Sequence, residues 1–503
     1  MSTGLVRIQL QPLGEAFDVP RGAQLRDVLF GYGLEFPCGG RGRCKRCRVR
    51  VLEGALAISP EEAGVLSPEE LRDGWRLACH ARADSPVTLE IAQWDAAILA
   101  DDSAFDFTPG EGLAVAVDLG TTTLVAQLLD LRTGRVLAVR AALNPQAVYG
   151  SDIMSRVQCA LAGQGAASLT DLVRGRIGGL VAELTAAAKT GDAAIRDIAI
   201  VGNAVMHHLF CGIDIEPLSH VPFEPRRDGL ELFRASALGW QVAGDPPVRF
   251  LPCLGGFVGS DILAGILATK MHQGDALVGL IDLGTNGEIV FGNRRRLICA
   301  STAAGPAFEA GRISMGMRAS TGAIAEVTLA EGRLQCRVLG DVAPRGICGS
   351  GLVDAVAAGL DLGAIQSSGR LAYGQSSFPL CPPVVLTQAD IRELQLAKAA
   401  CAAGIRILLE RLGAAPRDVQ RLYLAGAFGN YVKRASARRI GLIDFPDEIV
   451  HPSGNTALLG AKLALFSPAL DFASIRARVE HVPLAAHPQF QEIYVEEMGF
   501  PSG

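Results

Sequence analysis

The 503-residue sequence predicts a multidomain protein in which a small α+β domain precedes a larger α/β region made of two similar lobes. Three observations predict it: a strand-like alternation near the N-terminus, an aperiodic stretch between Trp94 and Gly112, and two related segments that begin at Leu113 and Leu277. We therefore expect a first domain over 1–93, a linker over 94–112 and an α/β region over 113–503, with lobes over about 113–275 and 276–503.

The composition excludes several classes of protein. With 49% hydrophobic and 20% charged residues and a net charge of −5, the chain has the composition of a folded protein and no bulk attraction for nucleic acid. No apolar run reaches the roughly 18 residues needed to span a bilayer, and Met1–Leu10 lacks the pattern of a signal peptide. The cysteines after Cys79 are scattered singly, as in a reducing compartment. We expect a cytoplasmic protein with neither nucleic acid nor membrane as partner.

Four cysteines of the first domain have the spacing of iron–sulfur ligands. Cys38, Cys44 and Cys47 lie in the run CGGRGRCKRC, and Cys79 follows in RLACHA, which gives C-x5-C-x2-C and a distant fourth cysteine. Glycines in the run let the backbone approach inorganic sulfide closely. The pattern indicates a [2Fe–2S] cluster and electron transfer; a structural zinc site or unrelated thiols are the alternatives.

The elements around these cysteines follow the order of a β-grasp ferredoxin, which residues 5–92 resemble as a whole. Val6, Ile8 and Leu10 alternate as in a strand, and a helix is expected over Leu25–Phe30. The cysteine run follows, and then the strand CRVRVLEG.

The two lobes begin with the same sequence unit. LAVAVDLGTTTLVAQLLD and LVGLIDLGTNGEIVFGN each contain an apolar strand, the turn Asp-Leu-Gly-Thr and a second strand. Turns at Arg132–Gly134 and Gly292–Asn293 lead each unit into a third strand. Helices are expected at about 151–162, 168–189, 203–211, 260–271, 349–360, 388–413 and 454–465.

A Gly-Thr turn that follows a carboxylate at a strand end suits phosphate. Backbone N–H groups of 119–123 and 283–288 can point at phosphoryl oxygens, threonine hydroxyls can donate, and Asp118 and Asp282 can hold Mg²⁺ through water. Glu288 and Asp261 could orient Mg²⁺ or water, or serve only as turn or helix carboxylates. One copy would be a weak signal, but two copies heading two lobes predict a phosphate site.

This arrangement resembles the superfamily of acetate and sugar kinases, Hsp70 and actin. The resemblance implies an RNase H-like, two-lobed ATPase that binds ATP and Mg²⁺, with Asp118, Asp282 and Glu288 as catalytic residues. We expect a tight turn at Gly349–Gly351 that feeds a helix from Leu352. The nucleotide-binding residues we expect are Gly120, Thr121, Thr122, Thr123, Gly202, Asn203, Gly284, Thr285, Asn286, Gly349, Ser350, Gly351, Gly426, Ala427, Phe428 and Gly429.

A ferredoxin domain joined to such an ATPase resembles the ATP-dependent reductive activators of corrinoid proteins. The likeness covers essentially the whole chain and includes NPQAVYGSDIMSR, VGNAVMHHLF, LPCLGGFVGSDILAGIL, GICGSGLVDAV and HPQFQEIYVEEM. It implies that ATP drives one-electron reduction of a corrinoid protein or methyltransferase from Co(II) to Co(I), the electron passing from a low-potential donor through the [2Fe–2S] cluster. Some relatives carry a further module where this chain has only a linker, and a homodimer is left open.

Two other functions remain open. Activators of 2-hydroxyacyl-CoA dehydratases share the ATPase fold, and CASTAAGPAFEAG from Cys299 is faintly similar to their cysteine segment, although they lack an N-terminal ferredoxin. A sugar-type kinase with a redox-sensing ferredoxin is the second alternative. We expect Cys348 to be a packed thiol, and His207 and His208 to pack or hydrogen-bond rather than bind metal, because no i, i+4 partner accompanies them.

Overall fold

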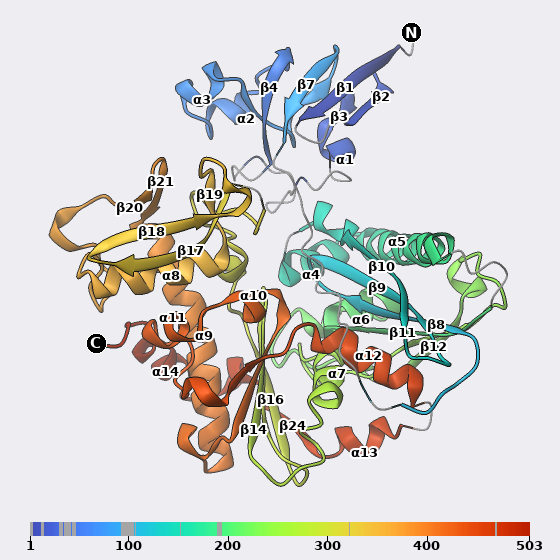
Figure 1. Ribbon diagram of the computed structural model, residues 1–503. Coiled ribbons are helices and arrows are strands. Elements are labelled where there is room, and N and C mark those ends of the chain that lie inside the picture. The colour runs from blue at the N-terminus through green and yellow to red at the C-terminus, as the bar shows by residue number, and fades with distance from the viewer. Residues whose placement is uncertain are drawn as a thin grey trace. The chain divides into compact units, whose positions relative to one another are not determined.

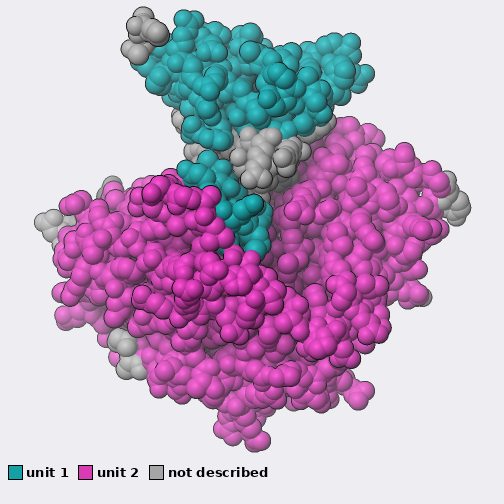
Figure 2. All heavy atoms as spheres, turned by 180° about the vertical axis from the view of Figure 1, so that it is seen from behind, with its two compact units in different colours: residues 1–96, 145–159 teal, residues 97–144, 160–503 magenta. Residues whose placement is uncertain are grey.

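The computed structural model describes residues 4–11, 15–29, 34, 42, 47–91, 105, 107–150, 152–188, 194–320, 322–467 and 470–502. These residues form two compact units, 1–96 with 145–159 and 97–144 with 160–503, which Figure 2 colours separately. None of the helices in the described ranges has the length and apolar character that crossing a membrane requires.

The first unit is built on a five-stranded sheet. In sheet order its strands are β2 (Glu15–Pro20), β1 (Leu5–Gln11), β7 (Val87–Glu90), β4 (Arg48–Gly54) and β5 (Trp75–Leu77). Strand β1 pairs in parallel with β7 and antiparallel with β2. As predicted, Val6, Ile8 and Leu10 are buried while their neighbours face outward, because successive side chains of a strand point to opposite faces. A short helix, α1 (Leu25–Leu29), follows β3 (Ala23–Gln24).

The larger unit contains two six-stranded sheets that share the order of five strands and carry the sixth strand at opposite ends of that order; several of the strands are labelled in Figure 1. The first, in sheet order, is β10 (Val136–Leu143), β9 (Thr123–Asp130), β8 (Leu113–Leu119), β11 (Ile195–Gly202), β13 (Pro247–Phe250) and β12 (Glu231–Arg234). The second is β23 (Val450–Pro452), β22 (Arg421–Ala425), β14 (Val278–Leu283), β15 (Gly287–Gly292), β16 (Leu297–Thr302) and β24 (Val479–His481). Each has an antiparallel meander whose first strand pairs in parallel with a later strand, β11 or β22. The repeated sequence units therefore form equivalent hairpins, as the predicted fold class requires.

Every predicted helix is present. The observed elements are α4 (Ile153–Ala160), α5 (Gly165–Ala188), α6 (Ala204–Cys211), α7 (Ser260–Thr269), α8 (Gly349–Asp361), α9 (Gln388–Leu412) and α12 (Thr456–Phe466). Helix α12 packs on β8, β11 and α7, whereas α9 packs on β15 and β16. The backbones of α7 and α12 approach closely at Gly460, where a Cβ atom would overlap the carbonyl oxygen of Ala264.

Two details differ from the prediction. Gly349–Gly351 is not a tight turn before a helix but the first turn of α8 itself, with Cys348 as the N-cap residue. The glycines serve close packing: Cβ atoms at Gly349 and Gly351 would overlap the carbonyl oxygens of Phe308 and Ile324. Helices α10 (Gly426–Tyr431), α11 (Arg434–Arg439), α13 (Phe472–Arg476) and α14 (Phe490–Glu496) were not predicted, because runs this short carry little periodicity.

The end of the expected linker packs on the first lobe. Phe105 and Phe107 lie with ring centroids 5.2 and 4.7 Å from that of Phe466 on α12. The Gly110 N–H donates to the carbonyl of Leu131. These described residues thus pack as part of the larger unit, since aromatic burial of this kind stabilises a folded segment.

Candidate functional site

Two of the four predicted cluster ligands lie side by side in the first unit. The Sγ atoms of Cys47 and Cys79 are 3.3 Å apart, and both residues are buried. This separation exceeds the roughly 2.05 Å of a disulfide and is close to the ~3.8 Å between two thiolates on one tetrahedral metal with bonds of about 2.3 Å. Cys38 and Cys44 lie outside the described residues. The donor set of Cys47 and Cys79 fits one iron of a cluster.

The first Asp-Leu-Gly-Thr hairpin is a tight turn between β8 and β9. The Gly120 N–H donates to the carbonyl of Thr123 at 3.1 Å, and Asn144 donates from Nδ2 to the carbonyl of Gly120 at 2.9 Å. Thr121 accepts from Nδ2 of Asn203 at 2.9 Å. The amide of Gly120 therefore serves the turn rather than a ligand.

The second hairpin has a turn one residue shorter, and its aspartate has a different partner opposite it. The Gly284 N–H donates to the carbonyl of Asn286 at 3.0 Å. Asp282 stands directly across the strand pair from Glu288. Residues opposite one another in an antiparallel pair share a face of the sheet, and like charges there repel. Glu288 also receives a hydrogen bond from the side chain of Asn286 and one from Ser301.

Four carboxyl groups from both lobes form one electrostatic cluster: Asp118, Asp261, Asp282 and Glu288. Burial, opposed by a hydrogen bond from Asn455, raises the pKa of Asp118 to about 6. Burial and the charge of Asp118 raise the pKa of Asp282 to about 7. For Asp261, on α7, burial and the charge of Asp282 raise the pKa to about 8, and the pKa of Glu288 is raised by burial and by Asp261. Such a cluster favours a cation beside it.

A bound metal would not have a full set of protein ligands there. Within the described ranges, no group of three or more His, Cys, Asp or Glu side chains is placed to hold one metal ion. Mg²⁺ keeps several waters and takes only one or two carboxylates together with substrate phosphates. The carboxylate cluster fits that mode of binding.

Glycine and asparagine loops bring the first hairpin against α6 and α7. Asn203 caps α6, accepting from the Met206 N–H at 3.0 Å. The N–H of Gly202 donates to Oγ of Ser260 at 3.1 Å. A Cβ at Gly259 would overlap the carbonyl oxygen of Gly202, so glycine allows the two loops to touch. Asn203 therefore both fixes its own turn and orients Thr121.

The expected nucleotide-binding residues 426–429 follow β22 and begin against the second hairpin. Gly426 begins α10 with φ of +80°, and a Cβ there would overlap a carboxylate oxygen of Asp282. The Phe428 ring stacks on that of Phe308 with centroids 4.7 Å apart and planes at 24°. The Gly429 backbone contacts Leu424, and the side chain of Ala427 lies outside the described atoms.

Three predicted residues of α8 differ in their surroundings. Gly349 packs under Phe308 and beside Phe428. Ser350 instead donates from Oγ to the carbonyl of Ala325 at 2.9 Å and lies 3.3 Å from the buried Cys348 thiol. The Ser350 hydroxyl thus holds α8 to β17 (Ala323–Ala330). Cys348 is a packed thiol, as expected.

Two site residues were missed by sequence reasoning. Asn455, the N-cap of α12, donates from Nδ2 to Oδ2 of Asp118 at 2.8 Å and accepts from the Leu458 N–H at 2.7 Å. Glu309 accepts hydrogen bonds from the hydroxyls of Thr122, at 3.4 Å, and Thr285, at 3.0 Å. An Asn before a helix is a recognisable cap signal, but nothing local indicates its contact with Asp118.

The histidine pair belongs to the core. His207 and His208 on α6 are fully buried. Nε2 of His207 lies 3.1 Å from the carbonyl of Gly229, and Nδ1 of His208 lies 2.7 Å from that of Ala204. Burial, helped by the neighbouring His208, lowers the pKa of His207 to about 4. Both rings are therefore neutral near pH 7 and pack within the first lobe, as expected.

Cys299 does not have the setting of a cluster ligand at a subunit surface. It lies on β16 with no exposed surface. Burial raises the pKa of its thiol, with a smaller effect of Glu480, and a protonated buried thiol is a poor metal ligand. This setting weighs against the dehydratase-activator alternative.

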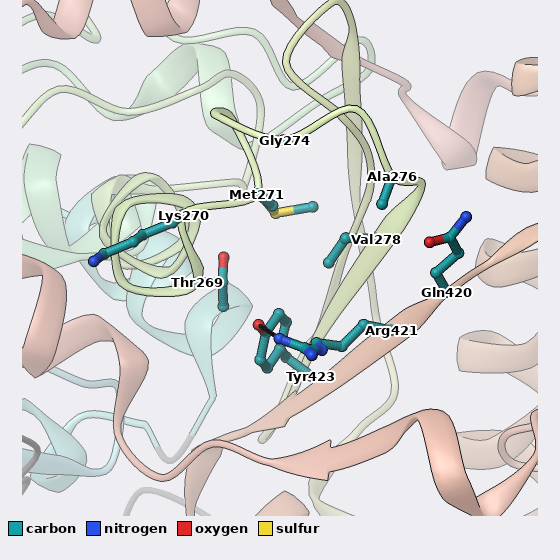
Figure 3. A pocket seen from close by; sticks show the side chains of 9 residues that line it. All are labelled: Thr269, Lys270, Met271, Gly274, Ala276, Val278, Gln420, Arg421 and Tyr423. Carbon is teal, nitrogen blue, oxygen red and sulfur yellow. Dashed lines mark hydrogen bonds between the residues drawn. The ribbon is translucent and has the colours of Figure 1, made fainter.

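A separate concavity of about 310 Å³ lies where α7 ends against β14 and β22. Figure 3 shows Lys270 and Met271 on one side and Arg421 beside Tyr423 on the other. Nη1 of Arg421 donates to the Tyr423 hydroxyl at 3.1 Å. None of the predicted site residues lines it, so it plays no part in the site built above.

Three family models match the chain in order. They are described as a 2Fe-2S iron-sulfur cluster binding domain (residues 8–84), the RACo middle region (113–274) and the C-terminal domain of RACo, the ASKHA domain (276–503). The last two matches coincide with the two sheets described above.

Several known proteins are similar over most of their length. The corrinoid activation enzyme RamQ of Eubacterium limosum is 30% identical, across 97% of this chain and 98% of its own. The [Co(II) methylated amine-specific corrinoid protein] reductase of Methanosarcina barkeri is 26% identical, across 77% of this chain and 76% of its own. A solved structure of a reductive activator for a corrinoid, iron-sulfur protein superposes with a TM-score of 0.70 at 26% identity, covering 99% of this chain and 98% of that one.

Proposed function

We propose that this chain, which belongs to the family of reductive activators of corrinoid proteins, reduces the cobalt of a corrinoid protein or methyltransferase from Co(II) to Co(I) by one electron and hydrolyses ATP to do so. The electron comes from a low-potential donor. A [2Fe–2S] cluster held by Cys38, Cys44, Cys47 and Cys79 would supply one-electron transfer when bound.

The observation that carries the ATP half of the proposal is the carboxylate cluster between two equivalent hairpins. Asp118 and Asp282 end the first strand of each lobe, and their pKa values are raised to about 6 and 7 chiefly by burial. Keeping such groups ionised needs a compensating cation. Asp118 and Asp282 would hold Mg²⁺ through water, and Glu288 would orient the hydrated ion from the second lobe.

The charges of Asp118 and Asp282 give a physical reason for the two lobes to move together when nucleotide binds. Asp118 belongs to the first lobe and Asp282 to the second, and the two repel each other. A cation and phosphate bound between them would replace this repulsion by attraction. Binding would therefore favour the arrangement of the lobes that brings the hairpins together, which is how a ligand shifts a conformational equilibrium.

Coupling to ATP is needed on energetic grounds. Plant-type ferredoxins have potentials near −400 mV, and reduction of Co(II) requires a lower potential. For a one-electron step each 59 mV changes the equilibrium constant about tenfold, so a modest gap suppresses the product strongly. Hydrolysis of ATP in the larger unit would offset that gap by changing how the partner is held.

The test is anaerobic absorbance spectroscopy of a Co(II) corrinoid protein encoded near this chain, mixed with the purified protein and titanium(III) citrate. Co(I) should form with MgATP and not with buffer or with the non-hydrolysable analogue AMP-PNP. Cys44→Ser should abolish the reaction and the iron content but leave ATP hydrolysis. Equal Co(I) formation without nucleotide, or a phosphorylated sugar as the only product of ATP turnover, would refute the proposal.

A further inference from the structure

A carboxylate sits between the two hairpins at the point where phosphate was expected. Glu309 ends a short 3₁₀ turn, Pro306–Glu309, which follows β16 in the second lobe. Its Oε1 accepts the Thr285 hydroxyl of the same lobe at 3.0 Å, and its Oε2 accepts the Thr122 hydroxyl of the first lobe at 3.4 Å. Thr285 of the second Asp-Leu-Gly-Thr unit and Thr122, the residue after the first unit, thus converge on one side chain.

This engagement changes what the two threonines can do. A hydroxyl has a single proton to donate, so Thr122 and Thr285 cannot also donate to a phosphoryl oxygen while they hold Glu309. A carboxylate group has about four acceptor sites in all, so the two hydroxyl donors do not exhaust them. A water molecule is the donor that an anion beside a phosphate group would accept.

The backbone that carries Glu309 is held in an uncommon conformation. Ala310 and Arg312, just after it, have φ of 55° and 61°, in the left-handed region that non-glycine residues rarely adopt. Such residues persist only where the surrounding structure over-determines them, and they cluster at functional sites. The packing supplies that restraint: Phe308 stacks on Phe428, and the glycine at 349 allows α8 to touch the Phe308 carbonyl.

We propose that Glu309 is the catalytic base of ATP hydrolysis, and that Thr285 from its own lobe and Thr122 from the opposite lobe are its positioning residues. This inference rests on the proposed function. Glu309 accepts one proton from the attacking water, whose oxygen forms a bond to the γ-phosphorus. The bond from that phosphorus to the β,γ-bridging oxygen breaks with its electron pair, which leaves on ADP. The proton then passes from Glu309 to solvent or phosphate.

The two positioning bonds differ in kind. Thr285 and Glu309 belong to one lobe, so their contact does not depend on the relative position of the two lobes. The Thr122 contact joins the lobes and is the longer of the two. The base is therefore fully oriented only while the first hairpin lies against the second, which ties the chemical step to closure of the lobes.

The experiment measures both turnover and binding for Glu309→Gln, with Glu448→Gln, an exposed glutamate of the same lobe, as the matched control. Removing a general base lowers kcat by about 100-fold or more. The Kd for AMP-PNP, from calorimetry, should stay within about threefold of that of the unaltered protein, because the base acts only in the transition state. Thr122→Val should lower kcat by about tenfold, with the thermal midpoint lowered by no more than about 3 °C.

A second variant separates chemistry from folding. Glu309→Ala leaves a space beside the two hydroxyls. Sodium formate should raise the ATP hydrolysis rate of this variant at least tenfold, because a small carboxylate can take the place of the missing one. A purely structural role for Glu309 would lower the thermal midpoint and show no formate rescue, which would overturn the inference.

The remaining outcomes are also decisive. If Glu309→Gln hydrolyses ATP at the unaltered rate, or binds AMP-PNP more than about fivefold tighter with undiminished turnover, Glu309 is a competitor of phosphate and not a base. In that case the proposed function stands, because the unaltered protein still turns over ATP. If the unaltered protein neither binds AMP-PNP nor hydrolyses ATP, both the proposed function and the role of Glu309 are refuted.

Discussion

The two Asp-Leu-Gly-Thr hairpins share a sequence and a fold but differ in their charge environment. In the first lobe, Asp118 lies across the strand pair from Val125 and receives a hydrogen bond from Asn455. In the second lobe, Asp282 lies across from Glu288, a second carboxyl group. Burial raises the pKa of both aspartates, to about 6 for Asp118, where the hydrogen bond from Asn455 opposes the rise, and to about 7 for Asp282, where the charge of Asp118 adds to it. A duplicated motif has become two electrostatically distinct halves of one site.

The largest effect should come from removing the two charges one at a time. We expect Asp118→Asn and Asp282→Asn each to lower Mg-dependent ATP hydrolysis by about 100-fold or more, because each removes charge from the place where the hydrated ion would bind. Phosphate release is the measurement. Asp444→Asn, an exposed aspartate of the second lobe, serves as the matched control.

The difference between the hairpins appears in metal affinity. Only Asp282→Asn relieves the repulsion on Glu288, which is then easier to ionise and can compensate for the lost charge. We therefore expect Asp282→Asn to lower the affinity for Mg²⁺ less than Asp118→Asn does. An unchanged rate in either variant would show that its hairpin does not serve the metal, and equal Mg²⁺ requirements would show that the two halves are equivalent.

A smaller effect tests the support of Asp118. Asn455→Ala loses both the α12 cap and the bond to Asp118, and we expect about tenfold slower ATP hydrolysis and a thermal midpoint lower by about 2–4 °C. Asn455→Asp keeps a capping oxygen but places a second charge beside Asp118. The repulsion opposes the restored cap, so the midpoint should stay below that of the unaltered protein, and activity should still be lost. Calorimetry and phosphate release measure the two quantities, and loss of stability without loss of activity would contradict the role given to Asn455.

The smallest effect concerns pH. The pKa values of Asp118, Asp282 and Asp261 are raised to about 6, 7 and 8 in the folded chain, against about 3.9 for an unfolded aspartate. Raised values make folding bind protons, so the associated stability is complete below about pH 4 and is lost as pH rises through 6 to 8. In magnesium-free buffer the thermal midpoint should fall by a few degrees between pH 5.5 and 8.5.

Adding Mg²⁺ with ADP should flatten this slope, because the cation compensates the newly formed charges. Asp282→Asn should flatten it without ligand. A midpoint that rises with pH over the same interval would mean that the carboxyl groups are not held close together.

Much of this protein follows from its sequence, because the relevant signals are local. The repeated Asp-Leu-Gly-Thr unit predicts the paired hairpins, and alternation at Val6, Ile8 and Leu10 predicts β1. The spacing of Cys38, Cys44 and Cys47 predicts an iron–sulfur loop. In each case the pattern lies within a short stretch of the chain, so it is visible without the fold.

Only the tertiary structure identified Glu309 and Asn455. Glu309 meets Thr122 across 187 positions of the chain, and Asn455 meets Asp118 across 337. Neither residue lies in a sequence motif that indicates phosphate binding. An isolated Glu or Asn is usually a surface residue or a helix cap. The raised pKa values have the same origin: burial and the charge of a second lobe act through space, and no local pattern of residues carries that information.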